Sequence, residues 1–457
     1  MSGSGHRVAH NDLPSEHDVE VYDVLVIGAG VAGLGAARAL LAARGELEVL
    51  VLEARERLGG RAHTDRRFAG FPVELGAEFI HGERAATWSF IEHLNLETVH
   101  WTKEDDSWVR LADGRRLTMR EARAADPALE VTRSWRLPPG VPRRFESFGA
   151  YLQRLGFDST RLEYVRRMYA NAAGESMRFL DATAALKGLD PAEVDGEEDH
   201  RILEGYGAVV EALGVGPEIL TGTIVTRVEW GANGVVVHDH EGHVFRAHSA
   251  LITLPLGVLQ AGGVEFDPPL PETKERALSG LGMGPVIKLV YRFAETITPD
   301  DITAVYSAGN PPMWWSPSAG HPTTEAVVWT ALVSGDGAVE LLRLGAADAL
   351  ERGLEALRRE LGRPGLQAQD AMLVDWVSDP FARGGYSHVR PGNDGARELL
   401  AEPTPPLYWA GEATAPEERA ATVHGALLSG ERAAAEIICA IDERERQASG
   451  AAPLTVA

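Results

Sequence analysis

The most constraining feature of this 457-residue chain is a strand–glycine–helix–strand unit near its N-terminus. Residues 22–27 form an apolar run typical of a strand buried on both faces, and three glycines in the spacing GxGxxG follow directly. A helix-forming stretch comes next, and a second apolar run, residues 47–52, ends at Glu53. This order predicts two parallel strands joined by a helix, the start of an α/β fold.

Each small or acidic residue of this unit has a physical role in holding a dinucleotide. Gly28 permits a tight turn, Gly30 lets the backbone approach a pyrophosphate, and Gly33 allows close packing of helix on strand. The helix N-terminus offers unpaired N–H groups and the positive end of its dipole to phosphates. Glu53 can accept hydrogen bonds from the ribose hydroxyls. It would repel a 2′-phosphate, which disfavours NADP. We therefore predict a cofactor that contains ADP.

The segment directly after Glu53 adds a second glycine pair flanked by arginines, among them Arg55. Gly60 lets the backbone pass close to a ligand, and Arg61 can neutralise a diphosphate with its planar guanidinium. The alternative is a surface loop with solvated arginines, which the nearby Glu53 disfavours.

Charge and cysteine content restrict the partners and the location. With 44 Lys and Arg against 67 Asp and Glu, the net charge of −23 disfavours nucleic acid and anionic membranes and favours a cationic substrate. The single cysteine, Cys439, excludes an intramolecular disulfide. Residues 1–20 are polar and predict a disordered arm, and no apolar run is long enough to span a membrane. We expect a cytoplasmic protein without nucleic-acid or membrane partners, monomeric or homodimeric.

The strand, the GxGxxG glycines, Glu53 and the letters LGGRAHT resemble the FAD-binding start of the flavin-containing amine oxidases. Five later segments resemble the same family: residues 71–82 with Gly76 and Ala77, the strand with Val225, residues 251–259, residues 375–387 with Trp376 and Tyr386, and residues 407–430 with Gly411, Glu412, Thr422 and Val423. The resemblance spans nearly the whole chain and implies FAD as the cofactor.

The resemblance also implies how these segments hold FAD. The segment of Gly76 and Ala77 passes the flavin ring, and Val225 contacts adenine through its backbone. Glu412 follows an apolar strand and can accept a ribityl hydroxyl. A helix that starts near Thr422 would aim N–H groups at flavin N1 and O2, where negative charge grows on reduction. An ordinary N-cap at Thr422 is the compatible alternative.

Three further residues are candidates for the reacting centre. Lys288 lies in an apolar run; in the family this lysine holds a water against flavin N5, and its charge could assist the reaction with O2. The alternative is an edge-strand lysine with its head in solvent. Trp376 and Tyr386 resemble the aromatic wall beside the isoalloxazine, with core packing as the alternative.

Departures from individual subgroups of the family indicate the substrate class. Gly385 stands where monoamine oxidases carry the cysteine that tethers the flavin, so we predict non-covalent FAD. Thr422 stands at their second cage tyrosine, which predicts an open site for long or secondary amines. Phe79 replaces the arginine with which amino-acid oxidases bind a carboxylate, whereas Glu78 and His81 suit a cationic substrate. A hydrogen-bonded core histidine is the alternative for His81.

The cofactor motifs lie far apart in the chain. This separation predicts a Rossmann-like FAD-binding domain assembled from discontinuous segments, residues 21–85, 205–265 and 396–445. The remaining segments would form an α+β substrate-binding domain, residues 86–204 and 266–395, and a flexible tail, residues 446–457. Within the substrate-binding domain we expect helices over residues 145–189 and strands at residues 286–293 and 326–333.

The predicted function is oxidation of a C–N bond in a polyamine or in another primary or secondary amine. Hydride would pass to flavin N5, O2 would become H2O2, and the imine would hydrolyse to an aldehyde and an amine. The alternatives are an L-amino-acid oxidase on the same scaffold, a non-catalytic flavoprotein and, more weakly, a flavin-linked desaturase.

No metal ion is predicted from the sequence. The histidines from His238 to His248 surround Glu241 and Gly242, which are typical of a solvated hairpin tip. The acidic run 195–199 either steers amines toward the cleft or is a surface loop.

Overall fold

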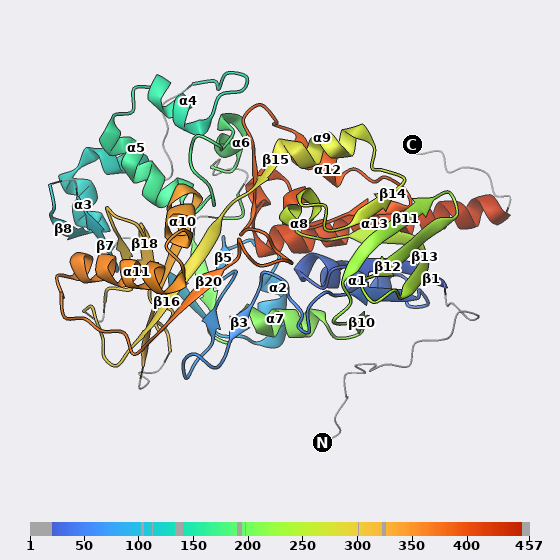
Figure 1. Ribbon diagram of the computed structural model, residues 1–457, viewed down its shortest axis with the longest axis horizontal. Helices are drawn as coiled ribbons and strands as arrows, with labels where there is room; N and C mark the ends of the chain where they lie inside the picture. Colours follow the sequence, from blue (N-terminus) through green and yellow to red (C-terminus); the bar gives the residue numbers. More distant parts are fainter. Residues whose placement is uncertain are drawn as a thin grey trace.

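The structure is a computed structural model that describes residues 21–101, 105–111, 113–132, 140–189, 194–196, 198–299, 301–321 and 326–449. The predicted arm, residues 1–20, lies outside the described residues, as do residues 450–457 of the predicted tail. The first four residues of that tail belong to the last helix, which continues to Ser449. Two parts lie side by side, one built on an eight-stranded sheet and one on a seven-stranded sheet (Figure 1).

The eight-stranded sheet takes its strands from three separate stretches of the chain. In spatial order they are β10 (Glu218–Leu220), β2 (Val49–Leu52), β1 (Val21–Ile27), β13 (Val244–Ile252), β12 (Gly234–Asp239), β11 (Val225–Gly231) and β14 (Glu265–Asp267), with β22 (Leu407–Trp409) also paired to β13. β10, β2, β1, β13 and β22 run parallel, which confirms the predicted α/β class. β12 and β13 are antiparallel, so the predicted hairpin around Glu241 is confirmed as well.

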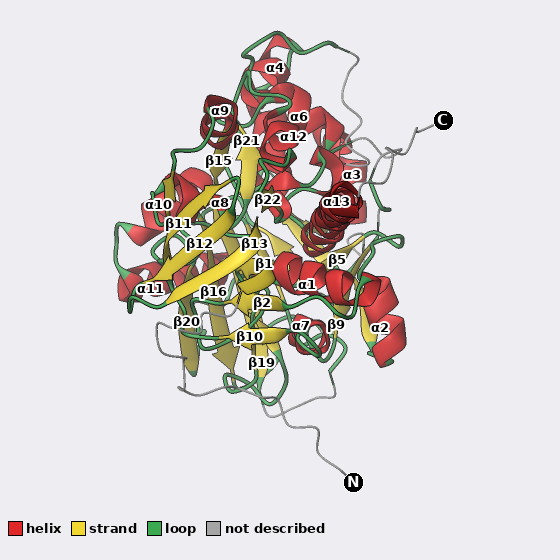
Figure 2. Cartoon of the chain, turned by 90° about the vertical axis from the view of Figure 1, so that its right-hand side faces the viewer, coloured by secondary structure: helices red, strands yellow, loops and turns green. Residues whose placement is uncertain are grey.

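The parallel strands are buried on both faces because apolar residues point to each side. Val24 packs on the face covered by α1 (Val31–Ala43) and α13 (Val423–Ser449), and Leu25 packs on the other face with residues of β11 to β13. Figure 2 shows α1 and α13 on the same side of the strands. A Cβ on Gly430 would lie 2.2 Å from a backbone oxygen of α1, so a glycine is needed where the two helices cross.

The seven-stranded sheet is mainly antiparallel. In spatial order its strands are β20 (Asp370–Asp375), β16 (Val286–Phe293), β19 (Val327–Ser334), β18 (Met313–Trp315), β17 (Ala304–Tyr306), β7 (Ser107–Arg110) and β8 (Arg116–Thr118). The two strands predicted in this part are confirmed, the second shifted by one residue. α10 (Gly335–Leu342) and α11 (Ala346–Leu361) pack on one face of β16 and β19.

Three small sheets and several short helices complete the described part. The small sheets are β5 (Phe79–His81), β9 (Asp199–Ile202) and β6 (Thr98–Trp101); β3 (Thr64–Asp65) and β4 (Val73–Glu74); and β15 (Leu281–Met283) and β21 (Ser387–Val389). The helices are α2 (Trp88–Leu94), α3 (Met119–Ala125), α4 (Phe148–Arg154), α5 (Ser159–Val165), α6 (Ala182–Lys187), α7 (Tyr206–Leu213), α8 (Leu256–Gln260), α9 (Glu272–Gly280) and α12 (Ala396–Ala401). Over the described residues, no helix has both the length and the apolar character that a membrane crossing requires.

Candidate active site

A cavity of about 1070 Å³ is lined by residues of both large sheets. All but one of the predicted site residues line it: Gly28, Gly30, Glu53, Arg55, Gly60, Arg61, Gly76, Ala77, Glu78, Phe79, His81, Val225, Lys288, Trp376, Tyr386, Gly411, Glu412, Thr422 and Val423. The exception is Gly33, where a Cβ would lie 1.9 Å from the carbonyl oxygen of Gly28. Gly33 therefore serves the packing of α1 on β1, as the sequence predicts.

The glycine-rich part of the cavity, which we define by Gly28, Gly30, Glu53 and Arg61, is shaped by the turn between β1 and α1. Gly28 has φ +111°, and a Cβ there would lie 2.7 Å from Oγ1 of Thr253. A Cβ on Gly30, in contrast, would meet nothing within 4 Å, so the backbone is open to a ligand at this point. The N-terminus of α1 begins one residue later and offers its N–H groups.

Glu53 is buried at the end of β2. Its Oε2 accepts a hydrogen bond from the N–H of Ala29 at 2.7 Å, and its Oε1 accepts one from the N–H of Arg55 at 2.9 Å. Burial raises the pKa of Glu53, and these two N–H groups oppose the rise. Each oxygen has a second lone pair, so the carboxylate can still accept two ribose hydroxyls.

Arg61 and Glu412 are bound to each other. Nη1 of Arg61 donates to Oε1 of Glu412 at 2.9 Å and to the carbonyl of Gly385 at 2.7 Å, and the hydroxyl of Ser387 donates to Oε2 of Glu412 at 2.6 Å. Burial acts to raise the pKa of Glu412, but Arg61, Arg397 and Ser387 together hold it below its usual range. Glu412 is therefore ionised, and Arg61 is anchored at the cavity wall.

The last helix starts at the cavity. Oγ1 of Thr422 accepts a hydrogen bond from the N–H of Gly425 at 3.0 Å and donates one to the carbonyl of Arg419 at 2.7 Å. Thr422 is thus an N-cap, the alternative that is compatible with a cofactor role. Val423 opens α13, so the helix presents its unpaired N–H groups and positive dipole end at the cavity lining.

Lys288 lies on β16 between β19 and β20, and its side chain is buried. Its Nζ donates to Oε2 of Glu78 at 3.0 Å and to the carbonyl of Glu74 at 3.0 Å, and it lies 5.2 Å from the centre of the Trp315 ring. The alternative of an edge-strand lysine with its head in solvent is wrong.

Glu78 is paired with protein groups through both of its oxygens, and it also lines the cavity. Its predicted contact with a cationic substrate stays a prediction. Oε2 binds Lys288, and Oε1 accepts from Nε1 of Trp315 at 2.7 Å and lies 3.6 Å from the guanidinium of Arg201. Glu78 is the counter-ion of these two cations, because a buried cation needs a partner charge.

The aromatic part of the cavity, which we define by Phe79, Trp101, Trp315, Trp376 and Tyr386, forms its apolar walls. Phe79 stacks on Trp101 with ring centres 4.6 Å apart and meets the edge of Trp315 at 5.5 Å. Trp101 and Trp315 were not predicted. Neither belongs to a segment with a distinctive spacing, and β6 and β18 bring them to the cavity only in the folded chain.

Trp376 and Tyr386 are both fixed by hydrogen bonds to backbone. Nε1 of Trp376 donates to the carbonyl of Leu75 at 3.0 Å, and the hydroxyl of Tyr386 donates to the carbonyl of Ala172 at 2.7 Å. A Cβ on Gly174 would lie 2.5 Å from the Tyr386 ring, so this ring packs directly on backbone. Both rings are packed in the protein and also line the cavity.

Two histidine–aspartate pairs lie at the cavity lining. His81 was a candidate site residue, and Asp195 and Asp199 are the two ends of the acidic run that was expected either to steer amines or to form a surface loop. Nδ1 of His81 lies 2.8 Å from Oδ1 of Asp199, and Nε2 of His424 lies 3.3 Å from Oδ2 of Asp195. The pKa of His424 is lowered to about 4, mainly by burial and secondly by the nearby His81. His81 is half exposed and bound to a carboxylate, so it is not a core histidine bonded to backbone.

The family model described as flavin containing amine oxidoreductase matches residues 31–438. The chain belongs to this family. The chain is 34% identical over 448 residues to lysine-specific histone demethylase 1 homolog 2 of Oryza sativa subsp. japonica, covering 92% of this chain and 57% of the relative. It is 30% identical to polyamine oxidase 4 of the same organism, covering 90% and 88%. The chain thus spans little more than half the length of the histone demethylase relatives it matches.

Solved structures with the same fold are known. Putrescine oxidase bound to putrescine has a TM-score of 0.75 at 24% identity, covering 92% of this chain and 99% of that chain. Cyclohexylamine oxidase from Brevibacterium oxydans IH-35A also has a TM-score of 0.75, at 20% identity, covering 93% and 100%. The predicted family and fold class are confirmed.

The residues at the cavity fit FAD. The open backbone at Gly30, the buried Glu53, the anchored Arg61 and two helix N-termini suit the phosphates and ribose of a dinucleotide. Phe79, Trp376 and Tyr386 add aromatic rings to the lining, which suits a flat heterocycle. The residue that precedes Tyr386 is Gly385, which has no side chain to form a covalent link.

Proposed function

We propose that the protein oxidises a C–N bond of a cationic amine, either a polyamine or another primary or secondary amine, with non-covalent FAD and O2. The observation that carries this proposal is the aromatic part of the cavity, next to the buried Lys288–Glu78 pair. When bound, FAD supplies the acceptor for the hydride of the amine α-carbon and passes the electrons to O2, which gives H2O2. The products would be an imine, which water hydrolyses to an aldehyde and an amine.

The aromatic walls would bind the amine. The faces of Trp and Phe rings attract a cationic nitrogen, and they also pack against the methylene groups of an amine substrate. Phe79, Trp101 and Trp315 are held in fixed positions by stacking and by the bond of Trp315 to Glu78. This wall would hold the substrate carbon in place and exclude water. Because the rings are already ordered, binding the substrate would cost little side-chain entropy.

Lys288 would speed the step in which O2 is reduced. Its ammonium is buried, fixed by two acceptors and part of the cavity lining. A fixed positive charge in a water-poor site stabilises negative charge that develops when O2 is reduced. Glu78 and the carbonyl of Glu74 would position this ammonium group.

The His81–Asp199 pair would receive the amine at the cavity lining. Asp199 fixes the orientation of the His81 ring, and the exposed part of this ring can accept a proton from an incoming ammonium group. The net charge of −23 would favour the approach of a cation.

A second candidate function, oxidation of an L-amino acid, has one specific observation in its favour. Arg123 of α3 lines the cavity, and its guanidinium could bind a substrate carboxylate. This arginine was not predicted, because it lies far in sequence from Phe79, where the resemblance places the carboxylate anchor. A peptide with a methylated lysine is a further amine to test, since histone demethylases are among the relatives.

A peroxide assay separates these substrates. The purified yellow protein would be mixed with spermine, putrescine, tyramine, leucine or a methyl-lysine peptide in air, and H2O2 would be measured. We expect H2O2 with a polyamine or simple amine and not with leucine, and an unchanged result in an Arg123→Met variant. Peroxide from leucine alone, lost in Arg123→Met, would replace the proposal with the second candidate.

Acid precipitation tests the mode of cofactor binding. We expect the flavin in the supernatant, and a yellow pellet would refute non-covalent FAD. The cytoplasmic location and the monomeric or homodimeric state stay predictions.

A further inference from the structure

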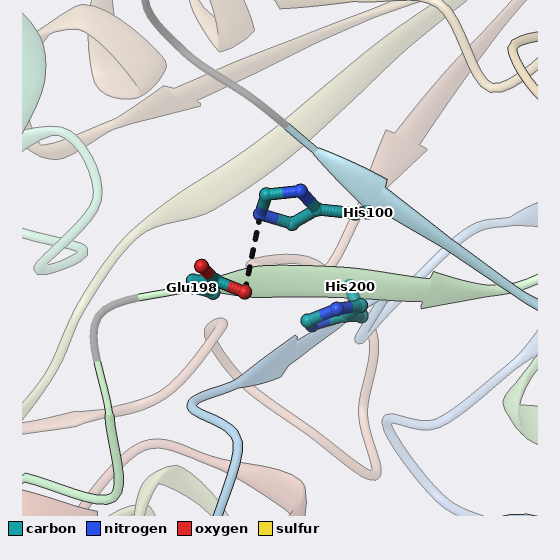
Figure 3. Close-up of side chains that lie close together, drawn as sticks. All are labelled: His100, Glu198 and His200. Carbon is teal, nitrogen blue, oxygen red and sulfur yellow. Dashed lines mark ion pairs between the residues drawn. The ribbon is translucent and has the colours of Figure 1, made fainter.

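Two histidines lie directly opposite each other on the small sheet beside the cavity. His100 of β6 pairs with His200 of β9, and Glu198 comes just before β9. The ring centres of the two histidines are 4.9 Å apart, and Nε2 of His100 lies 3.6 Å from Oε2 of Glu198. Figure 3 shows the carboxylate of Glu198 beside the ring of His100, with the ring of His200 close to both.

We propose that His100, Glu198 and His200 bind one divalent transition-metal ion, with Zn²⁺ as the expected occupant. Two imidazoles and one carboxylate are a ligand set that suits Zn²⁺ and its neighbours, and it suits Mg²⁺ and Ca²⁺ poorly because these prefer oxygen. Water would complete the coordination. This departs from our prediction that the protein holds no metal.

The distances allow such a site without a change of the backbone. One ligand atom from each of the three residues lies within 4.8 Å of the other two. A tetrahedral ion with bonds of about 2.0–2.2 Å holds its ligand atoms roughly 3.3–3.6 Å apart. The side chains of His100 and Glu198 are 40% and 52% exposed, so rotation about their own bonds can close the remaining gap.

Hydrogen bonds among His100, Glu198 and His200 do not account for their close approach. The 3.6 Å separation of His100 and Glu198 is too long for a hydrogen bond. Nδ1 of His200 is buried and has no hydrogen-bond partner among the residues that the structure describes. A bound ion would give the carboxylate and both imidazoles a common partner.

A second group of potential ligands, at the tip of the β12–β13 hairpin, serves as the comparison. The ligand atoms of Asp239, Glu241 and His243 also lie within 4.8 Å of one another, but Asp239 is buried and already accepts hydrogen bonds. Its Oδ1 accepts from the N–H groups of Glu241 and His243, and its Oδ2 lies 2.8 Å from Nδ1 of His243. These hydrogen bonds stabilise the hairpin turn and already give the carboxylate of Asp239 its partners, so an ion is not needed to pair it.

The proposed ion would also brace the cavity wall. Side chains alternate across a strand, and the neighbours of the two histidines, Trp101 and Asp199, are opposite each other in the same ladder and line the cavity. Linking His100 to His200 would fix the strand pair that carries Trp101 and Asp199. We therefore expect the ion to stabilise the folded protein.

The test uses the flavin-loaded protein without a polyhistidine tag, stripped of metals with a chelator. Calorimetric titration with Zn²⁺ is expected to show one site that weakens at least about tenfold in His100→Gln, in His200→Gln and in Glu198→Gln. His243→Gln is the matched control and is expected to bind as the wild type does. Retention of the flavin colour shows that each variant is folded.

Two further readouts keep the proposal falsifiable. Co²⁺ in place of Zn²⁺ is expected to give the visible absorption of a low-coordinate site in the wild type and not in His100→Gln. Zn²⁺ is expected to raise the Tm of the wild type and of His243→Gln, with no rise in His200→Gln. Absence of Zn²⁺ binding to the wild type, or equal binding by all variants, overturns the proposal.

Discussion

The glycine-rich and the aromatic parts of the cavity are rigid for different reasons. In the glycine-rich part the backbone makes the site: Gly28 has a positive φ, Gly30 leaves the backbone open, and the first residues of α1 line the cavity. In the aromatic part side chains make the site: Phe79 stacks on Trp101, and Lys288, Glu78 and Trp315 bind one another.

This difference has a consequence for substitutions. A backbone-built site fails completely when one added atom displaces the chain, because the interior is close-packed. A site built from side chains fails in steps, since each ring or charge contributes its own part of the binding energy. The predictions below use this contrast, from the largest expected effect to the smallest.

Gly33→Ala should abolish cofactor binding. The new Cβ would lie 1.9 Å from the carbonyl oxygen of Gly28, so α1 must move away from the turn that faces the phosphates. The measurement is the flavin absorbance of the purified variant, and we expect colourless protein. Gly70→Ala is the control, because a Cβ there meets nothing within 4 Å; a yellow Gly33→Ala protein would contradict the backbone-built site.

Lys288→Met should slow the reaction of the reduced enzyme with O2 by about 10²-fold or more, because the fixed charge is lost. Reduction by the amine under anaerobic conditions should change less. Rapid mixing measures the two half-reactions separately. Lys274→Met is the control: Lys274 is also buried and is bound by three backbone carbonyls, but it does not line the cavity. Near-normal reoxidation of Lys288→Met would remove the role of Lys288.

His424 should make stability pH-dependent. Its pKa is lowered to about 4 in the folded protein, while the unfolded chain has the ordinary value, about 6.5. The folded state therefore binds this proton more weakly, and stability is lost as the pH falls from 6.5 to 4, by up to about 3 kcal/mol.

Denaturant unfolding at several pH values measures this effect. The slope of stability against pH between 4 and 6.5 should decrease in His424→Gln and persist in His240→Gln, which changes an exposed hairpin histidine. An unchanged slope in His424→Gln would show that other groups cause the acid sensitivity.

Trp315→Phe should have the smallest effect, a decrease in kcat/KM of about tenfold. It keeps an aromatic wall and removes one hydrogen bond to the charged Glu78, worth about 1.5 kcal/mol or more. Steady-state kinetics with the preferred amine measures it. Trp314→Phe is the matched control, because Trp314 is buried in the core and does not line the cavity; it should lower the Tm and leave kcat/KM unchanged.

The same contrast explains what the sequence could predict. Glycines at fixed spacing and an acid at a strand end are local features, so Gly28, Gly30 and Glu53 can be assigned to one site from their spacing. The link of Thr422 to that site came from the family resemblance, because an N-cap alone does not show what the helix faces. The parallel strands can be predicted for the same reason, because their apolar runs are continuous.

The aromatic part could not be predicted in the same way. Trp101 and Trp315 come from strands of different sheets, and no sequence spacing joins them to Phe79. The binding of Glu78 to Lys288 and Trp315 could not be predicted either, because it depends on the pairing of distant strands. His100 and His200 are one hundred positions apart and meet through the register of β6 with β9.

Anaerobic mixing of the purified yellow protein with spermine, putrescine or tyramine tests the proposed amine oxidation most directly. We expect that at least one of these amines bleaches the flavin absorbance and that air restores it with release of H2O2. Flavin that stays yellow with every amine, or a protein that remains colourless after reconstitution with FAD, would contradict the central claim.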